Sequence, residues 1–289
     1  MASSGAQGHL IRTLVFRSVQ QLGAIAVLAA AGGAQSPRAT GAEMRTLAIG
    51  NALVGGSIAG IVARVRGVPV KKAIIAGFGG GFLSFYGKSI VSAKRIPLAP
   101  IVGGSVSAVG GSLIANVAGG DRPFSKLRIP VGPLRVTVAI DHRAVPRFSL
   151  NAYETVVFAA LLARPEVRFS AARSLRTAAS VFSTNAYPKE AGYSLGGAAV
   201  VSEFAPDPTA TLHHEVVHVL QQRFIQDALG TAVEEGIIGR WLRRKPPQWL
   251  ELGVTLPTLL WLDDALGGGR GPLRRSLEWE AERLESATH

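Results

Sequence analysis

The chain has 289 residues, a formal net charge of +12 and no cysteine. The absence of cysteine excludes a fold built on disulfides. Only 17% of the residues are charged and the mean hydropathy is +0.27, which argues against an ordinary soluble enzyme. Basic residues lie in short groups beside apolar segments, with few aromatic residues among them, and this favours anionic lipid over nucleic acid as a partner. The composition therefore predicts a membrane-associated protein that does not bind nucleic acid.

The N-terminus has the pattern of an export signal. Arg12 and Arg17 precede a short apolar run, and small residues follow as far as Ala34. A basic region, a short apolar core and a small-residue cleavage site are typical of signal peptides, and the core is too short to span a bilayer comfortably. We therefore predict a signal peptide at residues 1–34 and export to a membrane. An uncleaved anchor and a chain that starts at Met44 are the alternatives.

Residues 44–120 form a glycine-rich apolar region. The stretches 47–63 and 96–120 carry no charge, and 73–90 carries only Lys88. Glycines recur at close spacing, and small residues allow helix backbones to approach one another in lipid. The region predicts two or three short membrane helices, with a soluble glycine-packed core or a re-entrant hairpin as alternatives because each stretch is short for a span.

Residues 121–289 have a different composition, typical of a mixed α+β domain. The stretch 127–140 alternates and is rich in β-branched residues, which predicts strand, turn and strand. A helix is expected at 153–162, and a strand or hairpin at 193–204 with a bend near Gly197. We therefore expect an α+β fold: a small sheet with helices, preceded by the apolar helical region.

The most informative stretch is an H-E-x-x-H motif formed by His214, Glu215 and His218. Residues four apart share one face of a helix, so both imidazoles can bind one metal ion. Glu215 lies beside them and can reach a water on that metal. Asp207 is a suitable N-cap for a helix over 208–229, which would carry the motif. The alternative is a surface helix with two unrelated histidines.

A catalytic zinc site needs a third protein ligand. No cysteine exists and no histidine lies between His218 and His289, so the ligand must be a downstream carboxylate. The candidates are Glu234, Glu235, Glu251, Asp263, Asp264, Glu278, Glu280 and Glu282.

We favour Glu278, which lies in the first turns of an expected C-terminal helix. Glu282 follows one turn later on the same face, where it could hydrogen-bond a histidine ligand and orient it. Ala281 is small enough to let this helix approach the motif helix. Glu234 or Glu235 is the alternative ligand, and a merely solvated acidic helix is the alternative for the segment.

The motif with a distant downstream glutamate resembles the gluzincin class of zinc metallopeptidases. The resemblance implies a zincin-like domain in which His214, His218 and Glu278 hold Zn²⁺ and Glu215 is the general base. The resemblance is specific at the motif and loose elsewhere in residues 190–289. A common gluzincin pattern has Asp four residues after the glutamate ligand, whereas this chain has Glu282.

Further expectations follow from the same resemblance. In gluzincins a strand near the motif helix pairs with the extended substrate, which would place Gly197 to Val201 along the cleft. An ordinary core strand is the alternative. The apolar stretch 249–264 between motif and ligand resembles the integral-membrane peptidases related to the CAAX-prenyl proteases. An oxyanion donor is also expected, and the candidates are Tyr187, Tyr193 and His213.

The sequence thus predicts a membrane-associated zinc hydrolase that cleaves a peptide or protein substrate and contacts membrane lipid. The rival hypothesis is a noncatalytic membrane scaffold that binds lipid or a partner and carries an incidental motif. The sequence leaves open the substrate and the side of the membrane on which the site lies.

Overall fold

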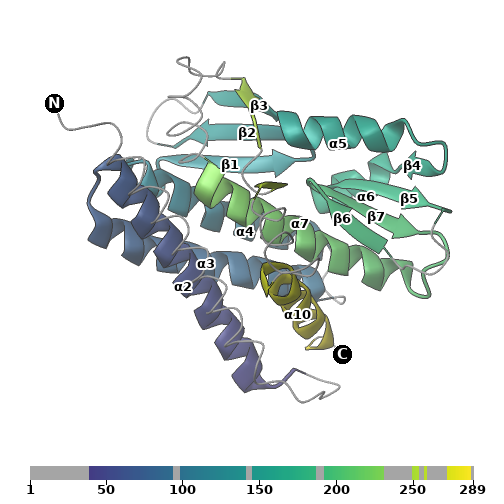
Figure 1. The fold of residues 1–289 in the computed structure, drawn as a ribbon, viewed down its shortest axis with the longest axis horizontal. Helices are drawn as coiled ribbons and strands as arrows, with labels where there is room; N and C mark the ends of the chain where they lie inside the picture. Colours follow the sequence, from purple (N-terminus) through teal and green to yellow (C-terminus); the bar gives the residue numbers. More distant parts are fainter. Residues whose placement is uncertain are drawn as a thin grey trace.

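The computed structural model shows an α+β fold (Figure 1). The expected signal peptide, and most of the apolar stretch 249–264, fall outside the residues that the structure describes. The structure describes residues 39–93, 98–140, 145–186, 192–230, 249–253, 257–258 and 272–287.

Three long apolar helices form the N-terminal part: α2 (Gly41–Arg66), α3 (Val70–Ser92) and α4 (Ala99–Ala118). They have 26, 23 and 20 residues, and each is long and apolar enough to cross a membrane. Helices α2 and α3 are longer than the stretches 47–63 and 73–90 that predict them, whereas α4 is shorter than the stretch 96–120. One reason is that α2 starts early, at a capping box in which Thr40 and Glu43 bond each other's backbone N–H groups.

Glycines allow these three helices to pack at very short separations. A Cβ atom built on Gly81 of α3 would lie 2.1 Å from the carbonyl oxygen of Asn51 in α2. A Cβ atom on Gly110 of α4 would lie 2.4 Å from the carbonyl oxygen of Gly80. No larger side chain fits at either contact, so the close approach expected from the glycine spacing is present on both sides of α3.

Two four-stranded sheets follow. The first has the order β1–β2–β3–β8, with β1 at Lys126–Val131, β2 at Leu134–Ala139, β3 at Pro146–Asn151 and β8 at Leu250–Glu251. The second has the order β4–β5–β7–β6, with β4 at Val167–Phe169, β5 at Ser180–Thr184, β6 at Gly192–Leu195 and β7 at Ala198–Ser202. Helix α5 (Ala152–Leu162) leads from β3 of the first sheet to β4 of the second, and α6 (Ala171–Thr177) joins β4 to β5 within the second sheet. The antiparallel pair β1–β2 confirms the strand, turn and strand expected at 127–140.

The hairpin expected at 193–204 is also present, as β6 and β7. Gly196 and Gly197 form its turn with φ angles of 50° and 76°, a region that glycine adopts at no steric cost. However, β7 pairs with β5 on one side and with β6 on the other. The expectation that Gly197 to Val201 line the cleft is therefore wrong for Ala198 to Val201, which lie inside the sheet in β7, and Gly197 lies in the turn before this strand. The edge strand is β6.

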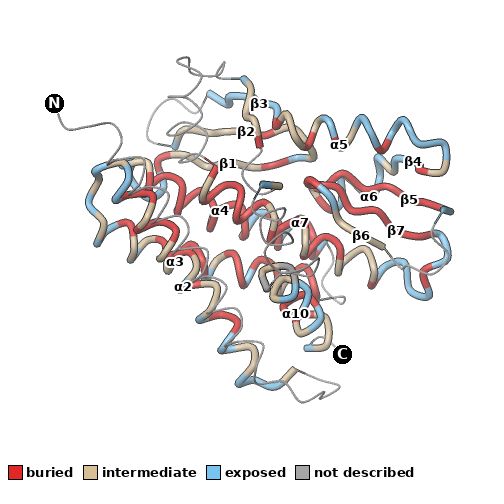
Figure 2. The backbone as a smooth tube through the Cα atoms, viewed as in Figure 1, coloured by how far each residue is buried: buried red, intermediate tan, exposed pale blue. Residues whose placement is uncertain are grey.

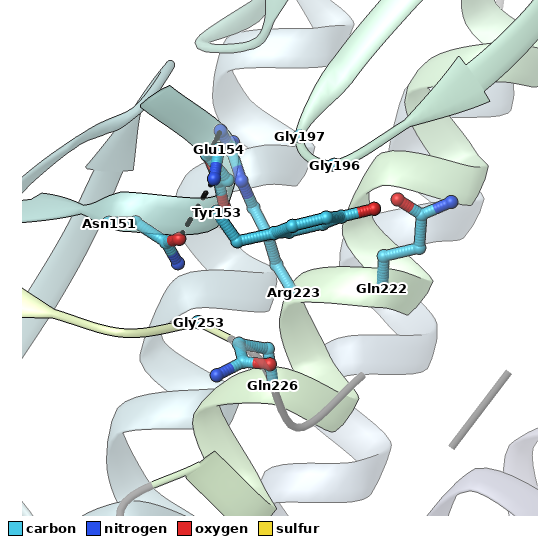
Figure 3. Close-up of a pocket in the computed structure, with 9 residues that line it drawn as sticks. All are labelled: Asn151, Tyr153, Glu154, Gly196, Gly197, Gln222, Arg223, Gln226 and Gly253. Atoms are coloured by element: carbon cyan, nitrogen blue, oxygen red, sulfur yellow. Dashed lines mark hydrogen bonds and ion pairs between the residues drawn. The ribbon is translucent and has the colours of Figure 1, made fainter. Parts of the chain in front are cut away.

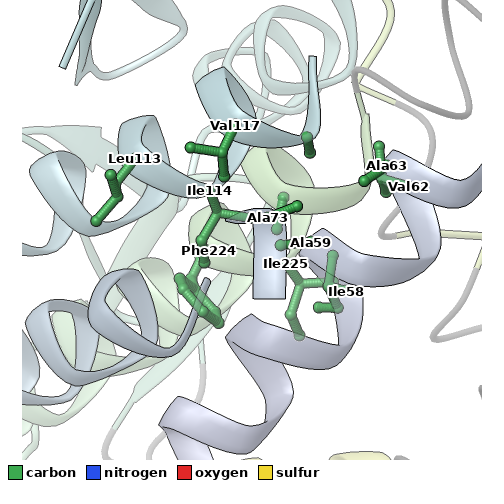
Figure 4. Close-up of a cluster of buried hydrophobic side chains, with 12 residues drawn as sticks. Ile58, Ala59, Val62, Ala63, Ala73, Leu113, Ile114, Val117, Phe224 and Ile225 are labelled. Atoms are coloured by element: carbon green, nitrogen blue, oxygen red, sulfur yellow. The ribbon is translucent and has the colours of Figure 1, made fainter. Parts of the chain in front are cut away.

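Helix α7 (Pro208–Gly230) lies between the apolar helices and the second sheet (Figures 1 and 2). Its residues Phe224, Ile225 and Ala228 share one buried cluster with residues of α2, α3 and α4, among them Ile58 and Ile114 (Figure 4). The change of composition near residue 120 therefore does not divide the core, because the motif helix and the apolar helices bury the same apolar surface.

Buried ion pairs join α7 to the first sheet and to α5. Arg135 of β2 pairs with Asp227 of α7 and with Glu251 of β8. Arg223 of α7 pairs with Glu154 of α5 at 3.3 Å, and its guanidinium also donates to two backbone carbonyls. Removing one partner of a buried pair would leave the other charge buried and unpaired, at a high cost in free energy. These contacts therefore fix the position of α7.

The glycine packing predicts opposite effects for two similar substitutions. Gly81→Ala should lower the free energy of unfolding by about 1–3 kcal/mol, because its Cβ overlaps the backbone of α2. Gly50→Ala on α2 meets nothing within 4 Å and should raise it by about 0.5–1 kcal/mol, since glycine is unfavourable inside a helix. Denaturant unfolding of the purified variants measures both, and equal effects would contradict the packing argument.

Candidate metal centre

The motif helix begins where the sequence predicts. Oδ1 of Asp207 accepts the backbone N–H groups of Thr209 and Ala210 at 3.1 and 2.9 Å, as an N-cap does. The helix that follows carries both motif histidines on one face. The Nε2 atoms of His214 and His218 lie 3.2 Å apart, so both rings direct the same nitrogen at one point.

Helix α10 (Pro272–Ser286) brings Glu278 to the same point. Its Oε1 lies 3.3 Å from Nε2 of His214, and its Oε2 lies 3.0 Å from Nε2 of His218. The helix docks through Ala281 and Leu284, both buried against residues of α7, α2 and α3. Glu278 itself is half exposed, which leaves one side of the cluster open to solvent.

These three residues could hold a metal ion, with one ligand atom from each within 4.8 Å of the others. Zinc ligands at about 2.0–2.1 Å in a tetrahedron lie about 3.3 Å from one another. The 3.2 Å between the two Nε2 atoms is close to one such edge. The contacts of 3.3 and 3.0 Å to Glu278 end on its two different carboxylate oxygens, so the carboxylate faces both imidazoles. Two imidazoles and a carboxylate suit Zn²⁺ and also other divalent first-row metals, so the donors fit a metal without selecting one.

The other candidate carboxylates of the described residues have different roles. Glu251 accepts the hydroxyl of Ser149 at 2.7 Å and pairs with Arg135. Glu280 is buried in an ion pair with Lys88 at 2.6 Å. The remaining candidates, Glu234, Glu235, Asp263 and Asp264, lie outside the described residues.

The partners of the histidines differ from those expected. Glu282, the expected partner, is exposed, and the carboxylate next to His214 is Glu285, whose Oε2 lies 3.3 Å from Nδ1 of the ring. Nδ1 of His218 lies 2.8 Å from Oε1 of Gln221. Sequence reasoning missed both, although Glu285 follows Glu278 by seven residues and Gln221 follows His218 by three, spacings that share a helix face.

The three residues are electrostatically coupled. Hydrogen bonds with both imidazoles lower the pKa of Glu278 well below its usual value. The hydrogen bond with Glu278 raises the pKa of His214, against the effect of burial. The carboxylate therefore favours a protonated imidazole beside it, and a metal cation can replace that positive charge.

Glu215 lies beside this cluster and against the edge strand β6. Its side chain is buried, and burial raises its pKa to about 7, although the two histidines act in the opposite direction. A Cβ atom built on Gly192 of β6 would lie 2.8 Å from Cγ2 of Thr211 and 3.2 Å from Cγ of Glu215. Among the described residues β6 is an edge strand of the second sheet, and it thus lies beside the motif helix at the position of Glu215.

A small pocket lies further along the same helix (Figure 3). Gln222 of α7 donates to Oγ of Ser194 in β6 at 3.0 Å, and the ring of Tyr153 extends toward Gln222. The residues that line the pocket are Asn151, Tyr153, Glu154, Gly196, Gly197, Gln222, Arg223, Gln226 and Gly253. Its space of about 10 Å³ corresponds to about one water molecule, too little for a substrate side chain.

The candidate oxyanion donors are placed only in part. Tyr187 lies outside the described residues. Tyr193 lies in β6, and its ring packs against the buried cluster that includes Phe182 and Val200, which gives it a structural role. His213 precedes the first motif histidine on α7. The structure therefore assigns none of the three to the cluster.

Two glutamate substitutions on α10 test the metal centre. Loss of the hydrogen-bond partner of a metal ligand weakens metal binding about 10- to 100-fold. Glu278→Gln changes a ligand itself, so it should weaken zinc binding by more than that. Glu282→Gln, one turn away on an exposed position, should leave the affinity unchanged. Chelator competition and metal content after dialysis measure the difference. Equal metal content in the two variants would show that Glu278 is not a metal ligand.

Acidification should release the metal. The pKa of His214 is raised above its usual value of 6.5, so a proton competes for this nitrogen already at pH values above 6.5. Glu278, whose pKa is lowered, stays ionised over the same range. The dissociation constant for zinc should therefore rise as the pH falls from about 8 toward 6, and a pH-independent constant would contradict the assignment of His214.

Comparison of the chain with protein-family models, with curated proteins and with solved structures found no match.

Proposed function

We propose that the protein is a membrane-associated, zinc-dependent hydrolase, and specifically a peptidase of the gluzincin type. The observation that supports it is the convergence of Nε2 of His214, Nε2 of His218 and the Glu278 carboxylate at 3.0–3.3 Å. Glu278 comes from a separate helix far downstream of the motif. An incidental pair of surface histidines would need no such carboxylate, and Glu215 completes the set that metal-assisted hydrolysis requires.

Each residue has a defined role in this proposal. His214, His218 and Glu278 would hold the metal, which supplies Lewis acidity that polarises a carbonyl and lowers the pKa of water. Glu215 accepts the proton of the attacking water and later passes it to the leaving amine. A pKa of about 7 suits this exchange, because such a group gains and loses a proton readily near neutral pH.

A peptide or protein is the proposed substrate because of the position of β6. This strand pairs with β7 on one side only, among the described residues, and it runs beside Glu215. An extended peptide can add to such an edge through backbone hydrogen bonds. Its carbonyl groups would then lie next to the three candidate metal ligands.

Membrane association is supported by an exposed apolar face on α2 and α3. Its members are Ile49, Leu53, Ile75, Phe82 and Tyr86. Basic residues flank this face at both ends: Arg45, Arg64, Lys71 and Lys72, all exposed. Apolar surface with flanking cations suits a bilayer that carries anionic lipid. Export by a signal peptide at residues 1–34 is also part of the proposal.

Glu215→Gln tests the hydrolase directly. The variant should keep its zinc yet cleave a fluorogenic peptide library at least about 10²- to 10⁴-fold more slowly, since it lacks the base. Glu203→Gln, an exposed change after β7, is the matched control and should cleave like the unmodified protein. Full activity of Glu215→Gln would reject it as base. Zinc binding without any cleavage by the unmodified protein would favour the scaffold hypothesis.

The pH dependence of cleavage gives a second test. Below its pKa Glu215 is protonated and cannot accept a proton, so kcat/KM should fall on acidification. Its pKa is about 7 without a metal, and a bound cation favours the carboxylate, so the midpoint should lie at or below about 7. Rates measured at saturating zinc test this, and a midpoint well above 7 would contradict the assignment.

A further inference from the structure

We infer that a buried hydrogen-bond chain anchored in the apolar helices holds His218 in the tautomer that leaves Nε2 free to bind metal. Gln221, Glu280 and Lys88 are the positioning residues of this chain. The inference rests on the proposed metal site, but it concerns where one proton lies on one ring, which can be measured without any assay of hydrolysis.

The first link is between His218 and Gln221. Nδ1 of the ring lies 2.8 Å from Oε1 of the amide, a good hydrogen-bond distance. Gln221 is almost completely buried, with 2% of its surface exposed. A buried amide has few ways to satisfy both of its ends, so the partners of its nitrogen decide which way it points.

The nitrogen of Gln221 has two partners, and both can only accept. Nε2 donates to the backbone carbonyl of Leu277 at 2.9 Å and to Oε2 of Glu280 at 2.8 Å. If the amide were reversed, its oxygen would face two acceptors, and both hydrogen bonds that its nitrogen donates would be lost. The oxygen therefore faces His218, and an oxygen acceptor requires that Nδ1 of the ring carries the proton.

A neutral imidazole with its proton on Nδ1 has its lone pair on Nε2. Nε2 is the atom of His218 that lies 3.2 Å from Nε2 of His214 and 3.0 Å from Oε2 of Glu278. Without a metal this carboxylate favours a further proton on Nε2, and that is the proton that a metal ion replaces. The chain thus selects the tautomer that the metal centre needs. His214 has a more exposed counterpart, since its Nδ1 lies 3.3 Å from Glu285, whose side chain is one-third exposed.

Lys88 keeps Glu280 an acceptor. Its Nζ lies 2.6 and 2.8 Å from the two carboxylate oxygens, and it also donates to Oδ1 of Asn51 at 2.7 Å. Nδ2 of Asn51 donates to the same carboxylate at 2.7 Å. Every described contact of this carboxylate is thus made by a donor.

The position of Lys88 in this chain explains why a charged residue lies within an otherwise apolar helix. Lys88 is the only charged residue between 73 and 90, and it is 1% exposed. A buried lysine is retained only when it is paired, and its partner here is two residues from the proposed ligand Glu278. The pair therefore connects the metal centre to α3, and through Asn51 to α2.

Gln221→Leu tests the inference, with Gln226→Leu on the same helix as the control of similar burial. Long-range ¹H–¹⁵N spectra of the metal-free protein report the tautomer of His218. They are recorded with Glu278→Ala in every sample, so that no carboxylate competes for the proton at Nε2, and at a pH at which the rings are neutral. On this background the otherwise unmodified protein and Gln226→Leu should show the proton on Nδ1. Gln221→Leu should show a mixture of tautomers and, with Glu278 present, bind zinc about 10- to 100-fold more weakly in chelator competition.

A double variant tests the anchor without leaving an unpaired charge. Lys88→Met with Glu280→Gln removes both ions, so the fold is not required to bury one of them alone. The orientation of Gln221 is then no longer imposed, and the same shift of tautomer and about tenfold or greater loss of zinc affinity should follow. Lys126→Met with Asp121→Asn removes an exposed pair and should change neither.

The outcomes separate this inference from the proposed function. If His218 keeps its proton on Nδ1 in both Gln221→Leu and the double variant, with zinc affinity within about twofold of the control, the inference is overturned even if the protein cleaves peptides. If the tautomer shifts as expected while the unmodified protein cleaves nothing, the inference stands and the peptidase proposal fails. Should Gln221→Leu not fold, the double variant decides.

Discussion

The docking of α10 against the apolar helices is the contact on which the metal centre depends. Glu280 and Glu278 are two residues apart, so they leave α10 in different directions. Glu280 enters a buried cluster with Lys88 and Gln221, whereas Glu278 reaches the two histidines from a more exposed position. The apolar contacts of Ala281 and Leu284 give the helix its burial, and the ion pair fixes its rotation. Without that rotation the third carboxylate would not face the imidazoles.

The glycine-packed layer has a second consequence for α7. Because α3 approaches α2 and α4 almost backbone to backbone, the three helices form one layer, and the long motif helix packs against residues of all three. The layer contributes apolar area to the near side of α7, and Arg135 and Glu154 contribute ion pairs to its C-terminal half. In the N-terminal half of α7, His214 faces Glu278 of α10 and Glu215 lies against β6. The motif thus lies on a rigid support, which favours a fixed ligand geometry.

Local signals predicted the parts of the site that a single helix determines. The four-residue spacing of His214 and His218 fixes their shared face, and Asp207 fixes where the helix begins. The acidic α10 was also recognised, but not its rotation. Glu282 and Glu285 follow Glu278 by four and seven residues, so both spacings fit one face, and only the crossing of α10 over α7 decides which carboxylate meets a histidine.

Long-range order was not predictable in the same way. The hairpin β6–β7 was expected from its residues, but nothing local distinguishes an edge strand from an internal one. The edge was therefore assigned to the wrong strand, because β5 pairs with β7 from elsewhere in the chain. The charge of Lys88 was visible in the sequence as an exception, yet its partner lies 192 positions away. Such a pairing follows from the packing of four helices rather than from any spacing.

The exposed apolar face and the three candidate metal ligands lie on different sides of the layer formed by α2, α3 and α4. On α3, Phe82 and Tyr86 face outward, whereas Phe85 and Lys88 face α7 and α10. A bilayer bound at the outer face would be separated from His218 by the thickness of about one helix, roughly 10 Å. In this arrangement a substrate pairing with β6 would approach from the side of the sheets, already extended, with its backbone donors and acceptors free to pair.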